Sequence, residues 1–227
     1  GKTDEAKARD WLKDPNYFGT TLVYMNKING MVSGANHPTG DTVRPALQII
    51  KTKPGVKLIS GAFIMQKGDE RYLFADCAIN LDPDANALAE IAVESGKVAK
   101  TFDIDPKVAL LSFSTKGSAK GDMVTKVQEA TKLAQEQAPD MAIDGEMQFD
   151  AAFVPTVAEK KAPGSNVAGK ATVFVFPELQ SGNIGYKIAQ RFGGFEAIGP
   201  ILQGLNKPVS DLSRGSNEED VYKVAII

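Results

Sequence analysis

A stretch near the carboxyl end of the chain combines residue types that could bind and react with a phosphate-like anion. Arg214 supplies a fixed positive charge, Ser213 a hydroxyl and Asp220 a carboxylate. Ser216 and Glu219 match a capping box, so we expect a helix to begin at Ser216. The free N–H groups of a helix start attract anions, and a carboxylate beside them could act as a base. An ordinary helix cap with a surface arginine accounts for the same residues.

Three of the five arginines stand next to glycine or proline turn signals: Arg44, Arg191 and Arg214. Arg44 follows a predicted strand at 30–34 and a polar loop, and we expect it in the first turn of the next helix. Such an arrangement places ligands at the carboxyl ends of strands in α/β proteins. Arg191 is expected near the end of a helix over 181–192, where it could hold a phosphate or offset the helix dipole.

Two other groups of polar residues have open interpretations. Asp144, Glu146 and Asp150 would share one face of a strand, as a metal site requires, or they are solvated carboxylates near a strand end. His37 lies in the polar loop, where we expect it to hold the backbone. No second His or Cys stands at ligand spacing, so a zinc site is not supported.

The sequence supports neither of two common nucleotide-binding motifs, and we expect its one cysteine to be unreactive. Gly164–Ala171 nearly spells a P-loop, but Ala171 replaces the metal-binding hydroxyl and the glycines precede a predicted strand. No Gly-x-Gly-x-x-Gly fingerprint is present, so a nicotinamide site is not indicated. Cys77 lies in an apolar run, where a buried, unreactive thiol is expected.

The composition indicates a globular protein without a nucleic-acid or membrane partner. The 227 residues are 43% hydrophobic and carry a net charge of -2. We see no basic run, no apolar run of membrane-spanning length and no signal peptide. A single cysteine fits a reducing, cytoplasmic location. Because the chain opens at Gly1 in helical sequence, we expect it to be truncated at the amino end.

Apolar spacing predicts alternating strands and helices, and therefore an α/β fold with a largely parallel sheet and one hairpin. The hairpin turn is expected at 67–70, and Pro54–Gly55 marks a candidate domain boundary. Helices are expected at 3–12, 19–27, 41–51, 84–100, 181–192, before Pro139 and from 216, and strands at 30–34, 58–66, 72–79, 108–113, 144–150, 172–176 and 195–202.

Taken in order, these segments resemble one family, the phosphate acetyl/butyryltransferases, and within it the phosphate acetyltransferases. The similarity covers essentially the whole chain. The segments that carry it are Ser33–Pro45, Asp144–Ala152, Val173–Pro177, Ser181–Gly185, Gly199–Pro208 and Asp211–Gly215.

The resemblance implies a fold and an activity. Members of the family transfer an acetyl group reversibly between CoA and phosphate. Their three-layer α/β/α fold is similar to that of isocitrate and isopropylmalate dehydrogenases, with the active site in a cleft between two lobes. By the same resemblance, 1–54 and 205–227 belong to an incomplete first lobe and 55–204 form an inserted second lobe. Acetyl-CoA, CoA, phosphate and acetyl phosphate are then the substrates, with no metal and no tightly bound cofactor, and a homodimer is expected.

The resemblance also implies roles for individual residues. Asp220 matches the general base that takes the proton of the CoA thiol, and Ser213 matches a hydroxyl that stabilises the transition state. Arg214 matches an arginine that grips the phosphoryl or CoA end. Arg44 matches one that faces the acyl phosphate, and Arg191 matches one that binds CoA.

Thr39, in the same segment as Arg44, is expected to bind substrate as well. Family members are longer at the amino end, and the additional part carries a further anion-binding arginine, so this chain alone could be inactive. The alternatives are a phosphate butyryltransferase, a decarboxylating dehydrogenase of the same fold, and an inactive fragment that binds CoA or a partner subunit.

Overall fold

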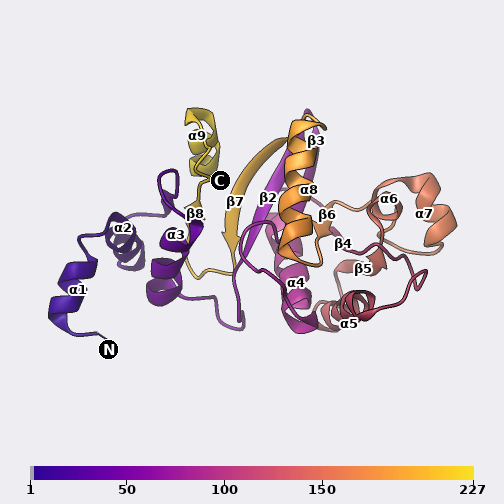
Figure 1. Cartoon of the computed structure of the whole chain (residues 1–227), viewed down its shortest axis with the longest axis horizontal. Helices are drawn as coiled ribbons and strands as arrows, with labels where there is room; N and C mark the ends of the chain where they lie inside the picture. The colour runs from indigo at the N-terminus through magenta and orange to yellow at the C-terminus, as the bar shows by residue number, and fades with distance from the viewer. Residues whose placement is uncertain (1–2) are drawn as a thin grey trace. The chain divides into compact units, whose positions relative to one another are not determined.

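The computed structural model describes residues 3–227, which fall into two compact units (Figure 1). The first unit extends to Ile59 and resumes at Gly199, and the second is Ser60–Ile198. Strand β7 (Glu196–Gln203) leads from the second unit back into the first. Residues 1 and 2, which the expected first lobe includes, lie outside the described residues. The assignment of 1–54 and 205–227 to one lobe of the family fold stays a prediction.

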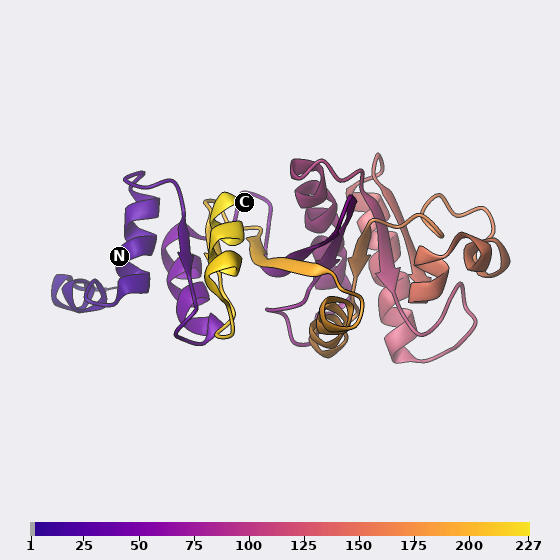
Figure 2. The same ribbon diagram turned by 90° about the horizontal axis from the view of Figure 1, so that it is seen from above.

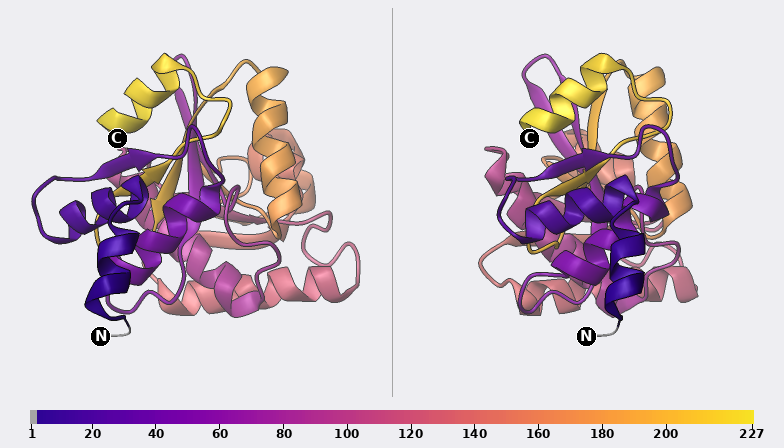
Figure 3. Two further views of the ribbon diagram at one scale, coloured as in Figure 1. Left: turned by 60° about the vertical axis from the view of Figure 1, so that its left-hand side comes forward. Right: turned by 90° about the vertical axis from the view of Figure 1, so that its left-hand side faces the viewer.

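The first unit is built around a short parallel strand pair, visible side by side in Figure 3 as a purple and a yellow strand. These strands are β1 (Met31–Ser33) and β8 (Val209–Asp211), and β8 also pairs in antiparallel fashion with β7. Helix α2 contacts β1, α3 contacts β8, and α9 contacts β1. The helical segments are α1 (Glu5–Trp11), α2 (Pro15–Tyr24), α3 (Thr39–Pro45), the π-helical turn η1 (Ala46–Ile50) and α9 (Glu218–Ile226).

The start of α2 differs from the sequence expectation, which placed this helix at 19–27. Asp14 caps the helix, because its carboxylate accepts hydrogen bonds from the N–H groups of Asn16 and Tyr17. Pro15 occupies the first helical turn, where its missing N–H costs nothing. The cap and the proline therefore start α2 four residues earlier than apolar spacing suggests.

The second unit has strand order β2-β3-β6-β4-β5. Strands β2 and β3 form the expected antiparallel hairpin, and the remaining pairs are parallel. The strands are β2 (Ser60–Lys67), β3 (Glu70–Ala75), β4 (Lys107–Leu111), β5 (Ala142–Met147) and β6 (Val173–Val175), and the helices are α4 (Ala85–Thr101), α5 (Asp122–Gln137), α6 (Phe149–Phe153), α7 (Pro155–Lys161) and α8 (Leu179–Arg191).

Helices cover both faces of the second unit's sheet, so this unit has three layers. Phe63 of β2 stacks on Tyr186 of α8 with ring centroids 4.1 Å apart, and Ala109 of β4 belongs to the same buried cluster. Val108, which points to the opposite face, meets α4 at Gly96. Helices α8 and α4 accordingly lie on opposite sides of the strands (Figure 2). The predicted α/β/α architecture is confirmed for this unit.

Strand β5 is shorter than expected and ends at Met147. The next residue, Gln148, donates its N–H to the hydroxyl of Thr115 at 2.9 Å, and the chain then turns into α6. Asp150 lies on that short helix, so the expectation of a strand through residue 150 is wrong. No helix within residues 3–227 is both long and apolar enough to cross a membrane.

Candidate functional site

Two of the segments expected to handle an anion follow the carboxyl ends of the parallel strands in the first unit. Ser33 ends β1, Asp211 ends β8, and the two residues are register partners. The N–H of Leu212 donates to the carbonyl of Ser33 at 2.7 Å and extends the pairing by one residue. After Ser33 the chain leads into α3 with Arg44, and after Asp211 it leads through Arg214 into α9. Both segments therefore start from neighbouring strand ends.

Helix α3 begins earlier than expected, so Arg44 occupies a different turn of the helix from the one predicted. Pro38 is the N-cap residue and Thr39 is the first helical residue, with Asp41 also in the first turn. Arg44 lies in the last turn, so the prediction that it stands in the first turn is wrong. Arg44 is exposed and Thr39 is half-buried.

The three arginines singled out from the sequence have no hydrogen-bond or ion-pair partner within residues 3–227. Arg44, Arg191 and Arg214 are exposed and make no hydrogen bond or ion pair with any residue in 3–227. The other two arginines are held: Arg9 by a glutamate at 2.8 Å and Arg71 by a backbone carbonyl at 3.4 Å. Three guanidinium groups thus remain available for anions. Two belong to the first unit, and Arg191 ends α8 in the second.

The terminal helix is capped one residue later than predicted. Asn217 accepts a hydrogen bond from the N–H of Asp220, and the Asp220 carboxylate accepts one from the N–H of Asn217, both at 2.9 Å. This pair is a capping box, and α9 begins at Glu218. The predicted Ser216–Glu219 box is therefore wrong by one residue. Asp220 steadies the helix start and stays partly exposed.

His37 joins the loop after β1 to two other elements. Its Nε2 lies 3.0 Å from Nδ2 of Asn16 on α2 and 3.1 Å from Oγ of Ser33 at the end of β1. Ser33 also donates to Oδ1 of Asn16 at 2.5 Å. The three side chains form one network that fixes the loop leading into α3, in line with the structural interpretation of His37.

The three carboxylates considered for a metal site have protein partners of their own. No group of His, Cys, Asp and Glu side chains in the part of the chain that the structure describes could hold a metal ion. The interactions are Asp144 with Lys116 and Ser165, Glu146 with Ser114 and the N–H of Gly117, and Asp150 with Lys161. These contacts make all three carboxylates structural.

Glu146 is the most buried of them, at 2% exposure. Burial alone would raise its pKa. Burial is the largest single influence, but the hydrogen bonds that the carboxylate accepts outweigh it together. They include those from the N–H of Gly117 at 2.7 Å and the hydroxyl of Ser114 at 2.9 Å, which stabilise the ionised form. The net result is a pKa below the ordinary value for glutamate.

The glycines at the start of α8 serve packing. A Cβ on Gly182 would come 2.2 Å from the carbonyl of Asp76, and one on Gly185 would come 2.9 Å from the ring of Phe176. The glycines let α8 approach the ends of the strands. Cys77 is fully buried nearby, and burial raises the pKa of its thiol well above the ordinary value. An unreactive thiol follows, as predicted.

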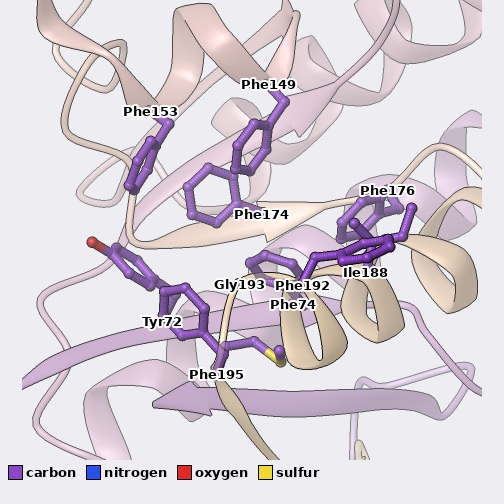
Figure 4. A pocket seen from close by; sticks show the side chains of 13 residues that line it. Tyr72, Phe74, Phe149, Phe153, Phe174, Phe176, Ile188, Phe192, Gly193 and Phe195 are labelled. Carbon is purple, nitrogen blue, oxygen red and sulfur yellow. The ribbon is translucent and has the colours of Figure 1, made fainter. Parts of the chain in front are cut away.

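The second unit also contains an aromatic pocket of about 420 Å³ (Figure 4). It lies between strand residues such as Tyr72 and Phe174 and the end of α8 at Phe192. Phe192 is 92% exposed. None of the expected catalytic or substrate-binding residues lines this pocket.

The protein is an α/β protein of two units. In the first unit, Arg44, Arg214 and Asp220 lie on the segments that follow the ends of the parallel strands β1 and β8. The whole sequence, residues 1–227, matches the family model described as phosphate acetyl/butaryl transferase. The chain belongs to this family, as its motifs predicted.

Three relatives illustrate the match. The phosphate acetyltransferase of Bacillus subtilis is 67% identical over 227 residues, which are 100% of this chain and 70% of that protein. A phosphotransacetylase from Streptococcus pyogenes has 66% identity and a TM-score of 0.96, with 100% of this chain and 69% of that one covered. The 4-hydroxythreonine-4-phosphate dehydrogenase of Klebsiella pneumoniae, at 12% identity and a TM-score of 0.56 over 92% of this chain and 66% of that one, shares the fold. The predicted dehydrogenase-like fold is confirmed.

Proposed function

We propose that this protein is an acyltransferase that moves an acetyl group reversibly between CoA and phosphate. Acetyl-CoA and phosphate are converted into acetyl phosphate and CoA, or the reverse. The observation that carries the proposal is the family match over the entire chain. Arg44, Arg191 and Arg214 have no partner within residues 3–227, which agrees with substrates that carry several negative charges.

In the direction of acetyl-CoA synthesis, Asp220 takes the proton of the CoA thiol. The thiolate attacks the carbonyl carbon of acetyl phosphate, and Ser213 donates a hydrogen bond to the oxyanion that forms. The bond between the carbonyl carbon and the phosphate oxygen then breaks, and phosphate leaves with the electron pair. Arg44 and Arg214 hold this phosphate group, while Thr39 contacts the same substrate.

Arg191 is proposed to bind CoA. Its guanidinium group is exposed at the end of α8 and unpaired within residues 3–227, which suits a phosphate of the nucleotide portion. No step of the proposed reaction calls for a metal ion or a tightly bound cofactor, because a thiolate and an activated acyl phosphate react directly.

The test is CoA-dependent release of phosphate from acetyl phosphate, with Asp220→Asn as the variant. We expect turnover to fall about 100-fold to 10,000-fold, the usual contribution of a general base. Asparagine can still accept the hydrogen bond of Asn217, so α9 should remain capped. Glu219→Gln, the neighbouring exposed carboxylate on the same helix, is the matched control and should retain turnover.

Full turnover by Asp220→Asn would show that another group is the base. Faster reaction with butyryl phosphate than with acetyl phosphate would assign the butyryl preference instead. Binding of CoA in a calorimeter without any turnover would favour the CoA-binding fragment, and NADP-linked oxidation of hydroxy acids would favour a dehydrogenase.

We also infer a homodimer that pairs through α8, in a cytoplasmic setting that suits the free thiol of Cys77. Ile184, Ile188 and Phe192 follow one another at four-residue spacing and are 57%, 52% and 92% exposed. They form an apolar stripe, and two of them, Ile188 and Phe192, also line the aromatic pocket. A contiguous apolar surface of this kind favours a protein partner. We favour a second copy of this chain as the partner. In a two-fold dimer the same surface of each copy faces the other, so the stripe and the pocket of both copies would be covered in one interface.

A further inference from the structure

Asp211 is a buried carboxylate between the two segments on which the proposed function depends. Its side chain belongs to a residue that is 1% exposed, and Oδ1 accepts no hydrogen bond from any residue in 3–227. Thr42 of α3 is fully buried, and its Oγ1 likewise lacks a partner among these residues. Each buried polar atom without a partner costs about 1–3 kcal/mol. Packing alone would favour an apolar side chain here.

The surroundings of Asp211 come from both segments. Gly34, at the start of the loop after β1, lies so close that a Cβ would come 2.2 Å from Oδ1. Burial raises the pKa of Asp211, while the nearby hydroxyl of Thr39 and the N–H of Leu212 act in the opposite direction. One carboxylate thus touches the loop after β1, the first turn of α3 and the chain that leaves β8.

The segment after β8 has few other supports. Ser213 and Arg214 are exposed, and the Ser213 side chain has one hydrogen bond, a contact of 3.3 Å from the N–H of Gly215 in the same turn. Within the turn, the carbonyl of Ser213 accepts one further bond, from the N–H of Ser216 at 3.0 Å. The place of Ser213 and Arg214 therefore depends mainly on the end of β8, where Leu212 is bound to Ser33 and β8 contacts α3. A shift of this strand end would move Arg214 relative to Arg44.

We propose that Asp211 is a positioning residue that holds the α3 segment and the 212–214 segment in one arrangement, so that Arg44 and Arg214 bind the same phosphate group. The inference rests on the proposed function, since it assumes that both arginines serve one anion. Asp211 acts through the arginines, because a side chain with this degree of burial does not reach the substrate.

The experiment compares Asp211→Ala with Asp211→Asn. Alanine removes the packing of the carboxylate, and we expect phosphate affinity, measured by calorimetry, to fall about tenfold. We expect kcat to fall about 100-fold with KM values for CoA nearly unchanged, the effect of an ångström-scale misplacement. Asparagine keeps the shape of the side chain and should restore both quantities to within about threefold of the wild type. If alanine prevents folding, Asp211→Ser serves the same comparison.

Glu94→Ala is the control for simple destabilisation. Glu94 is also a buried carboxylate, 6% exposed, but it lies on α4 in the second unit. The Glu94→Ala substitution should lower the melting temperature and leave phosphate affinity unchanged.

The positioning role would be overturned if Asp211→Ala bound phosphate as tightly as the wild type. It would also be overturned if Asp211→Asn, with the stability of the wild type, lost as much phosphate affinity as Asp211→Ala. A wild-type chain that binds no phosphate would overturn it as well. A chain that binds phosphate in an Asp211-dependent way but shows no turnover would leave the positioning role standing and refute the proposed reaction.

Discussion

Gly34 follows the end of β1 and packs closely against Asp211, the last residue of the neighbouring strand β8. A Cβ on residue 34 would meet Asp211 Oδ1 at 2.2 Å and the N–H nitrogen of Leu212 at 2.6 Å. Gly34 also has a φ of +117°, a backbone conformation that other residues rarely adopt. The lack of space and the backbone conformation therefore both require glycine here. The lack of space is caused by Asp211, which lies far away in the sequence.

Replacing Gly34 with alanine should disturb this junction. We expect a loss of about 1–3 kcal/mol in the free energy of unfolding. The new methyl group would clash with the end of β8, which is held by its pairing with β1, and alanine would be strained at this φ. Phosphate affinity should fall with it, since the same contact supports Asp211. Urea denaturation and calorimetry measure the two effects.

Gly40→Ala is the matched control. Nothing lies within 4 Å of a Cβ at Gly40, and the residue is on α3, where alanine favours the helix by up to about 1 kcal/mol. Equal destabilisation by the two alanine variants would contradict the packing argument for Gly34.

The capping box predicts a difference between two neighbouring polar residues. Asn217→Ala should destabilise α9 by about 0.5–2 kcal/mol, because the N–H of Asp220 loses its acceptor. Ser216→Ala should have almost no effect, since the side chain of Ser216 does not cap the helix. Hydrogen exchange at the Asp220 amide measures the change directly, and faster exchange in the Ser216 variant alone would contradict the assignment.

The same residues show why the cap could not be placed from the sequence. Ser216 with Glu219 and Asn217 with Asp220 both fit the spacing of a capping box. The structure selects the second pair because the N–H of Ser216 is already bound to the carbonyl of Ser213 at 3.0 Å in the preceding turn. That turn depends on where β8 ends, which local sequence does not specify.

Strand β8 illustrates the same limit on a larger scale. Long periodic segments such as α4, which begins after its cap Asp84, were predicted closely. Strand β8 has only three residues, too few to show an alternation of apolar and polar side chains. Its partner β1 lies far away in the sequence. The burial of Asp211 follows only from that pairing. The motif residues Arg44, Ser213 and Arg214 could be singled out in advance, but the side chain that links their segments could not.

The sequence left the acidic cluster with two interpretations, a metal site and solvated carboxylates, for a related reason. Asp144 and Glu146 both lie on β5, in line with the predicted strand. Their partners, however, come from the loop after β4, which places Ser114 and Lys116 beside the two carboxylates. A strand pattern alone does not reveal which loop covers its end.

Glu146 predicts a specific loss of stability in acid. Its pKa is lowered in the folded protein, so its contribution is fully present above the pKa of the unfolded chain and disappears as pH falls through the folded value. Glu146→Gln should lower the free energy of unfolding by about 1–3 kcal/mol at neutral pH, because it breaks a buried charge-assisted network. The difference from the wild type should shrink on acidification below about pH 4. Glu136→Gln, an exposed glutamate on α5, is the control and should behave as the wild type at every pH. A constant difference across the pH range would contradict the role of the Glu146 charge.

The proposed dimer makes the exposed ring of Phe192 a decisive position. Burial of one such ring contributes about 1.5–3 kcal/mol, and a two-fold interface would bury it twice. Phe192→Asp should therefore weaken association by about 100-fold or more and yield a monomer in light scattering at micromolar concentration. Leu81→Asp removes another exposed apolar side chain of the second unit, 76% exposed and outside the aromatic pocket, and should remain dimeric. A monomeric wild type, or a dimer that survives both changes, would rule out pairing through α8.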